Sequence, residues 1–188
     1  MALKATVYKV NLSIADMDRQ YYGDHQLTLA CHPSETEERM MVRLLAFSLY
    51  ASDELVFTRG ISTDDEPDLW QRDLAGQINL WVELGTPDID RIRKGCHRAD
   101  QMVVMCFGDR APGVWWDRLR PKVSRFDNLT VLHLAGDDCQ SLRSLIARTM
   151  GLQVSIQDGQ VLVTDGEHSA HVTPGLWLSA SNCGASHD

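Results

Sequence analysis

Hydrophobic and polar residues alternate near both ends of the chain, and this pattern predicts two β-hairpins. Residues 6–14 alternate in part and residues 26–31 alternate fully, with turn-forming Asp and Gly residues between them. Toward the other end, residues 153–156 and 161–164 flank Asp158-Gly159, a pair typical of a type I′ turn. The chain should therefore begin and end with an antiparallel hairpin.

Helical periodicity is visible in four segments between these hairpins. Ser34 is a favourable N-cap and Glu37 completes a capping box, so the first helix should run from there to about Ser52. Thr86 as N-cap and Pro87 as first helical residue predict the start of the second helix. The other two predicted helices contain residues 115–123 and, after a cap at Asp137 or Asp138, residues 142–150.

Three further segments are typical of strands. In residues 77–85, Ile78, Leu80, Val82 and Leu84 point one way and Gln77, Asn79, Trp81, Glu83 and Gly85 the other. Residues 102–107 and 129–134 are apolar runs, as in strands that are covered on both faces. The order of elements predicts an α/β fold with one mixed central sheet and flanking helices, plus the two terminal hairpins. We expect a single domain over residues 1–178 and a flexible tail over residues 179–188.

Composition agrees with an ordinary globular protein. The chain has 188 residues, 44% of them hydrophobic, which suits one domain of common size. It contains no apolar run of roughly 20 residues and no signal-peptide pattern. Its five cysteines are scattered without a Cys-x-x-Cys pair, which is typical of reduced thiols. We therefore expect a cytoplasmic protein with no membrane partner.

The charge is polarised along the chain. The formal net charge is −8, which disfavours approach to a polyanion, yet residues 90–125 contain nine basic and four acidic side chains. Within this stretch Arg91, Lys94 and Arg98 share one face of the second predicted helix. This basic stripe could contact nucleic-acid phosphates, or it could simply be a solvated helix face, and the pattern leaves both open.

Two carboxylates could carry chemistry. Asp68 and Glu83 are fifteen residues apart and fall at or near neighbouring predicted strands. Mg²⁺ is usually held by one or two protein carboxylates together with water and phosphate, so these two residues are candidate metal ligands. Lys94 could then stabilise charge that develops on a phosphate. The other interpretation of Glu83 is a solvent-facing residue on the polar side of its strand.

The chain resembles the YaeQ family of bacterial cytosolic proteins over nearly its whole length. The resemblance is carried by Pro67-Asp68, by the strand that ends in Glu83-Leu84-Gly85, and by residues 32–41, 87–94 and 97–99. It implies a variant of the PD-(D/E)XK nuclease fold. In that fold the motif aspartate would correspond to Asp68 and the second acidic residue to Glu83.

The resemblance also implies a glutamate on the first helix and a lysine at the site. The glutamate is assigned to Glu38, with Glu35 and Glu37 as alternatives. The motif lysine is missing, because Gly85 occupies its place, so a lysine from the neighbouring helix would be needed. Lys94 is the candidate for this role, and Arg91 is the second.

Two functions remain open at this point. One is a protein with a nuclease-like fold that holds Mg²⁺ or phosphate at Asp68 and Glu83 and binds nucleic acid or a regulatory partner without turnover. The other is an Mg²⁺-dependent nuclease in which Lys94 replaces the motif lysine. Under the first, Arg91, Lys94 and Arg98 are phosphate contacts; under the second, Glu38, Asp68, Glu83 and Lys94 are catalytic. A protein partner and the oligomeric state are left open by the sequence.

Overall fold

The structure is a computed structural model that describes residues 4–59 and 65–181. The chain forms two compact units. The first unit comprises Met1–Ala51 with Ala135–Pro174, and the second comprises Ser52–Leu134 with Gly175–Asp188. Each unit has its own mixed β-sheet, so the expectation of one central sheet is wrong. That residues 1–178 make a single domain stays a prediction.

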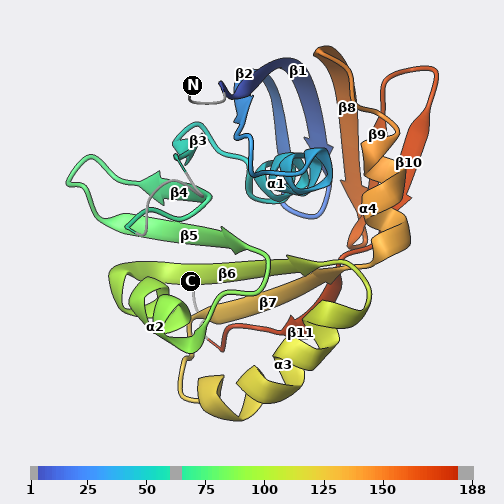
Figure 1. Ribbon diagram of the computed structural model, residues 1–188. Coiled ribbons are helices and arrows are strands. Elements are labelled where there is room, and N and C mark those ends of the chain that lie inside the picture. The colour runs from blue at the N-terminus through green and yellow to red at the C-terminus, as the bar shows by residue number, and fades with distance from the viewer. Residues whose placement is uncertain (1–3, 60–64, 182–188) are drawn as a thin grey trace. The chain divides into compact units, whose positions relative to one another are not determined.

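The predicted hairpins join to form the sheet of the first unit (Figure 1). The strand order is β10-β9-β8-β1-β2, in which β1 and β8 pair in parallel and the other pairs are antiparallel. The strands are β1 Thr6–Asp16, β2 Tyr21–Cys31, β8 Thr149–Gln157, β9 Gln160–Thr164 and β10 Ser169–Val172. Helices α1 Glu37–Tyr50 and α4 Gly136–Arg143 belong to the same unit and contact each other.

The turn chemistry of the two hairpins explains part of this arrangement. Asp158 and Gly159 have φ of 52° and 72°, which confirms the predicted type I′ turn between β8 and β9. The Asp18 carboxylate, in the turn of the other hairpin, accepts hydrogen bonds from Asp158 N at 2.8 Å and Gly159 N at 2.9 Å. The two turns are therefore tied to each other as well as through the β1–β8 ladder.

The second unit contains the sheet that carries the candidate site. Its strand order is β11-β7-β6-β5-β4-β3, with β5, β6 and β7 parallel to one another and the other pairs antiparallel. The strands are β3 Leu55–Phe57, β4 Leu69–Arg72, β5 Ile78–Leu84, β6 Ala99–Phe107, β7 Leu129–Leu134 and β11 Gly175–Leu178. The predicted buried strands correspond to β6 and β7, whose inner residues are shielded from solvent.

Helices α2 Ile89–Arg98 and α3 Arg110–Val123 contribute to one hydrophobic core with this sheet. Trp81, Met102 and Leu129 are fully buried in that core. Gly95 lets α2 lie close to β6, because a Cβ atom there would be 2.4 Å from the Met102 sulfur. The position of α2 over β5 and β6 is therefore fixed by packing, and this positions its basic side chains.

Two helix starts differ from the sequence expectation by two residues. The N-cap of α1 is Thr36, whose hydroxyl accepts a hydrogen bond from Arg39 N, and not Ser34. The N-cap of α2 is Asp88, which accepts from Arg91 N at 2.8 Å, and not Thr86. Several residues that can cap a helix adjoin each start, and a difference of two residues is within the usual uncertainty of a helix boundary.

The prediction for α4 was wrong at both ends. Its N-cap is Ala135, without a side-chain hydrogen bond, while Asp137 and Asp138 lie in the first turn. The helix ends at Arg143, and Met150 is a buried residue of β8. Pairing with β1 outweighs the helical spacing of the apolar residues in this segment.

The expected tail is only partly described. Ala180 N bonds the Thr130 hydroxyl at 3.4 Å and Ser181 N bonds Asp127 O at 2.7 Å, so these two residues are attached to the second unit. Residues 182–188 lie outside the described part of the chain. Among the described residues, no helix has the length and apolar character needed to cross a membrane.

Candidate functional site

Asp68 and Glu83 lie at the adjacent strands β4 and β5 of the second unit. Asp68 immediately precedes β4, and its neighbour Leu69 pairs with Val82. Asp68 N donates to Val82 O at 3.0 Å, and Asp68 Oδ2 accepts from Leu84 N at 2.8 Å. Asp68 is only 2% exposed, and these bonds place its carboxylate beside the end of β5.

Glu83 is held by two donors. Its side chain is 13% exposed; Oε1 lies 3.1 Å from Arg91 Nε, and Oε2 accepts from the Trp81 indole at 3.0 Å. Burial raises the pKa of Glu83, the charge of Asp68 raises it further, and Arg91 and Trp81 act in the opposite direction. The two carboxylates therefore repel each other in a poorly solvated place, where a proton or a cation is favoured.

This shift gives Glu83 a characteristic pH dependence. The folded-state pKa lies above that of an unfolded glutamate, about 4.3, so the folded protein binds more protons between the two values. The stability that the protonated group contributes is therefore complete below about pH 4.3 and is lost as pH rises through the folded pKa. In Glu83→Gln this titration is absent.

We accordingly expect the free energy of unfolding of Glu83→Gln, relative to wild type, to increase across that pH window and then to level off. Urea unfolding of both proteins between about pH 4 and about pH 8 measures the difference. A difference that is constant with pH would contradict the raised pKa.

Arg91 is a basic residue in direct contact with the acid pair, which comprises Asp68 and Glu83. Its backbone N bonds Asp88 at the start of α2, and its guanidinium reaches both Glu83 and the carbonyl of Glu66, the latter at 2.5 Å. The guanidinium carbon also lies 5.7 Å from the centre of the Trp81 ring. The resemblance ranked Arg91 second for this position, after Lys94.

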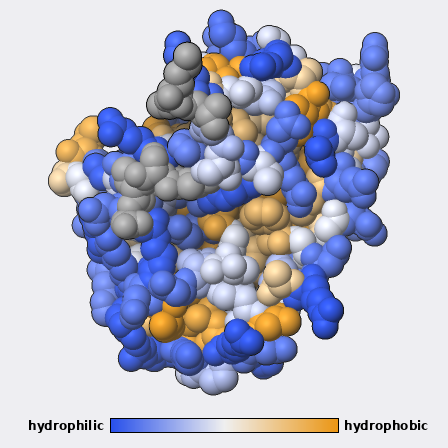
Figure 2. Space-filling view, viewed as in Figure 1, coloured by the Kyte–Doolittle hydropathy of each residue, from blue (hydrophilic) through white to orange (hydrophobic). Residues whose placement is uncertain are grey.

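Lys94 makes an ion pair with Asp65 instead. Lys94 Nζ lies 2.6 Å from Asp65 Oδ1, and Arg98 donates to Asp65 O at 3.3 Å. Lys94 is also the main reason that the pKa of Asp65 lies below its ordinary value. The acidic segment Asp65-Glu66 therefore lies along the basic stripe of Arg91, Lys94 and Arg98. On the face shown in Figure 2, hydrophilic side chains gather over α2.

Gly85 has a backbone conformation that disfavours any side chain, including a lysine, at this position. Its φ is +91°, a conformation that L side chains rarely adopt, and its N bonds Met105 O at 2.9 Å. A Cβ atom at this position would meet nothing within 4 Å. The obstacle to a side chain at residue 85 is thus backbone conformation and not lack of space.

The helix glutamates belong to the first unit. Glu38 lies in the first turn of α1, as expected. Glu35 binds Arg39 and Arg43 at 3.1 and 2.9 Å, and Glu37 accepts from the Tyr8 hydroxyl at 2.8 Å. Asp68 and Glu83 are in the second unit. The assignment of Glu38 to their site stays a prediction.

The donor set limits how a metal ion could bind. Within residues 4–59 and 65–181, no group of three or more His, Cys, Asp or Glu side chains could hold one. A cation at Asp68 and Glu83 would have two carboxylates, would need water or phosphate oxygens as further ligands, and would displace Arg91 from Glu83. The Cys96 thiol offers no alternative chemistry, because burial raises its pKa to about 12.

The sequence reasoning did not anticipate the roles of Asp65, Glu66 and Trp81. The available signal was charge: an acidic segment precedes Asp68, and a basic stripe follows Glu83. Opposite charges on nearby elements of one sheet favour contact. No pattern in the sequence could show which cation meets which anion.

Comparison with known proteins agrees with the resemblance seen in the sequence. The family described as "YaeQ protein" matches residues 1–174. The "Uncharacterized protein YaeQ" of Escherichia coli strain K12 is 44% identical over 181 residues, which are 96% of this chain and 100% of that protein. The protein of the same name from Shigella flexneri has the same identity and coverage.

Two crystal structures share the fold. The YaeQ protein of Xanthomonas axonopodis pv. citri has a TM-score of 0.90 and 48% identity, over 93% of this chain and 99% of that chain. The YaeQ protein of Pseudomonas syringae has a TM-score of 0.89 and 32% identity, over 95% and 98%. Since both the sequence and the fold match over nearly the full length, the chain belongs to the YaeQ family.

Proposed function

We propose that this YaeQ family protein binds nucleic acid without cleaving it. In this proposal Asp68 and Glu83 hold a divalent cation such as Mg²⁺, while Arg91, Lys94 and Arg98 contact phosphates. The observation that carries the proposal is that the Arg91 guanidinium contacts Glu83 of the acid pair, while Lys94 pairs with Asp65. Arginine stays protonated and binds phosphate in a fork, which suits binding better than proton transfer.

The acid pair supports the cation part of the proposal. Burial, and after it the charge of Asp68, raises the pKa of Glu83, and the single positive charge of Arg91 acts against this shift. A hard divalent cation supplies twice that charge and prefers oxygen ligands. When it binds, Arg91 would be released from Glu83 and could reach a phosphate oxygen.

The acidic segment supports the phosphate part. Asp65 and Glu66 place oxygen atoms on the basic stripe, as phosphates would. The Asp65 carboxylate contacts Lys94, the Asp65 carbonyl accepts from Arg98, and the Glu66 carbonyl accepts from Arg91. The Asp65 side chain is 86% exposed, so its pair with Lys94 is weak and can exchange for another anion. Asp65 would thus compete with nucleic acid for the stripe.

We therefore expect Asp65→Asn to bind single- or double-stranded DNA or RNA more tightly than wild type, by a few-fold, because one competing charge is removed. Lys94→Ala should bind more weakly, and the slope of the logarithm of its binding constant against the logarithm of the salt concentration should be less steep by roughly one unit. Fluorescence anisotropy across a salt series measures both quantities. Lys122→Ala, a basic residue of α3 outside the stripe, is the matched control.

The same samples test for cleavage. The proposal predicts salt-sensitive binding and intact nucleic acid in the presence of Mg²⁺ or Mn²⁺. The proposal would be contradicted if Lys94→Ala bound nucleic acid as tightly as wild type does, or if wild type did not bind it at low salt. The second candidate is an Mg²⁺-dependent nuclease, in which Lys94 would have to exchange its exposed partner Asp65 for the bound phosphate. That candidate predicts cleavage by wild type and none by Lys94→Ala.

A further inference from the structure

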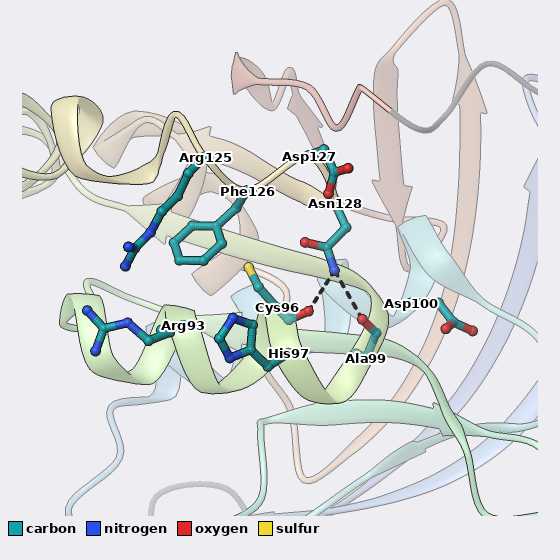
Figure 3. A pocket seen from close by; sticks show the side chains of 9 residues that line it. All are labelled: Arg93, Cys96, His97, Ala99, Asp100, Arg125, Phe126, Asp127 and Asn128. Atoms are coloured by element: carbon teal, nitrogen blue, oxygen red, sulfur yellow. Dashed lines mark hydrogen bonds between the residues drawn. The ribbon is translucent and has the colours of Figure 1, made fainter.

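The second unit contains a pocket at the C-terminal half of α2 that shares no residue with the acid pair or the basic stripe. It has a volume of about 490 Å³, which is within the range of small-molecule sites. Its walls come from α2, the start of β6 and the segment between α3 and β7 (Figure 3). The pocket is therefore formed by α2, β6 and the segment after α3, all of which contribute residues to the hydrophobic core of the second unit or pack against it.

One end of the pocket is cationic. Figure 3 shows the guanidinium groups of Arg93 and Arg125 on the same side of it. Arg93 pairs with Asp90 at 2.5 Å, but these side chains are 43% and 78% exposed, so the pair is weak and can exchange. For Arg125 the structure records no ion pair within residues 4–59 and 65–181. Two arginines in this arrangement can bind an anionic group such as phosphate.

The middle of the pocket is aromatic. The rings of His97 and Phe126 are 6.3 Å apart and nearly perpendicular, and Arg125 lies 5.0 Å from the centre of the Phe126 ring. Phe126 N bonds Val123 O at 3.0 Å, which fixes the segment that carries this ring. A flat unsaturated group can pack on such a surface.

The opposite end offers acceptors. Asn128 donates through Nδ2 to the carbonyls of Cys96 and Ala99, at 2.9 and 3.0 Å, which leaves its Oδ1 as an acceptor. Asp100 and Asp127 also lie at this end (Figure 3). The Asp100 carboxylate already accepts from Gln77 at 2.9 Å. These carboxylates repel a chain of phosphates and attract hydrogen-bond donors.

We propose that this pocket binds a small ligand with one anionic end, a flat unsaturated body and hydrogen-bond donors at the far end. A purine nucleoside monophosphate has this chemistry. Its phosphate would be held by Arg93 and Arg125, its base would pack on Phe126 and His97, and its exocyclic amine would donate to Asp127 or Asn128. The separation of charges distinguishes this site from one for a nucleic-acid strand.

Titration calorimetry with AMP, adenosine and inorganic phosphate tests the proposal on the full-length protein. AMP should bind more tightly than either of its parts, because both ends of the pocket contribute. Arg125→Gln should weaken AMP binding by about tenfold, the expected loss of one charge-assisted hydrogen bond, and should leave adenosine binding unchanged. Asp127→Asn should weaken AMP and adenosine but not phosphate.

Arg120→Gln, an exposed arginine of α3 that does not line the pocket, is the matched control and should bind AMP as wild type does. Thermal unfolding of each variant confirms that it is folded. No binding of AMP at millimolar concentration would overturn the proposal. Equal losses in Arg125→Gln and Arg120→Gln, or phosphate binding as tight as that of AMP, would also overturn it.

Discussion

Arg91→Gln is expected to destabilise the protein by about 3 kcal/mol, the usual cost of removing one partner from a poorly solvated ion pair. Arg91 compensates Glu83, whose side chain is 13% exposed and lies close enough to Asp68 for its pKa to be raised. It also bonds the carbonyl of Glu66. Glutamine retains an N–H donor but is shorter than arginine and carries no charge. Urea unfolding at neutral pH measures the loss.

Arg93→Gln is the matched control for this change. Arg93 lies on the same helix and also pairs with a carboxylate, but its side chain is 43% exposed and that of Asp90 is 78% exposed. Exposed pairs contribute well under about 1 kcal/mol. If the two variants lost the same stability, Arg91 would have no special role at the acid pair.

Trp81→Ala is expected to have the largest effect, a loss of about 4 kcal/mol, the usual range for a fully buried large aromatic residue. Trp81 is 0% exposed in the core of the second unit. Its ring packs edge-to-face with that of Trp70, and the two ring centres are 6.4 Å apart. Its indole also donates to Glu83. The change should therefore unfold much of the protein at moderate urea concentrations.

Trp81→Phe separates the two contributions of the indole. Phenylalanine keeps an aromatic ring in the core but cannot donate to Glu83 Oε2. We expect it to lose less stability than Trp81→Ala and to raise the pKa of Glu83 further, so the pH-dependent loss of stability should extend to higher pH. Urea unfolding across pH measures both effects. An unchanged pH profile would show that the indole does not stabilise the ionised carboxylate.

Local patterns were sufficient to predict much of the second unit. The alternation of Ile78, Leu80, Val82 and Leu84 identified β5, and continuous apolar runs identified β6 and β7, because the sequence pattern follows from which faces of a strand are buried. The same alternation placed Glu83 on a defined face of β5. With Asp68 at the start of an adjacent strand, two carboxylates near one end of the sheet could be expected.

Non-local pairing could not be predicted in this way. The β1–β8 ladder joins segments at opposite ends of the chain, so the terminal hairpins form a separate sheet that neither hairpin signals alone. The contacts of Arg91 with Glu83 and of Lys94 with Asp65 depend on how α2 packs over β5 and β6, and Gly95 leaves room there for the Met102 side chain. Helical spacing showed that the cations share a face, but not which anion each one meets.

The proposed cation site is tested most directly by thermal unfolding at increasing Mn²⁺ concentration. Three proteins are compared: wild type, Arg91→Gln, and the triple variant Arg91→Gln/Asp68→Asn/Glu83→Gln. If a cation and Arg91 compete for the acid pair, Mn²⁺ should raise the unfolding temperature of Arg91→Gln more than that of wild type. The triple variant, whose acid pair carries no charge, should not respond. An equal response in all three proteins, or no response in Arg91→Gln, would contradict a divalent-cation site at Asp68 and Glu83.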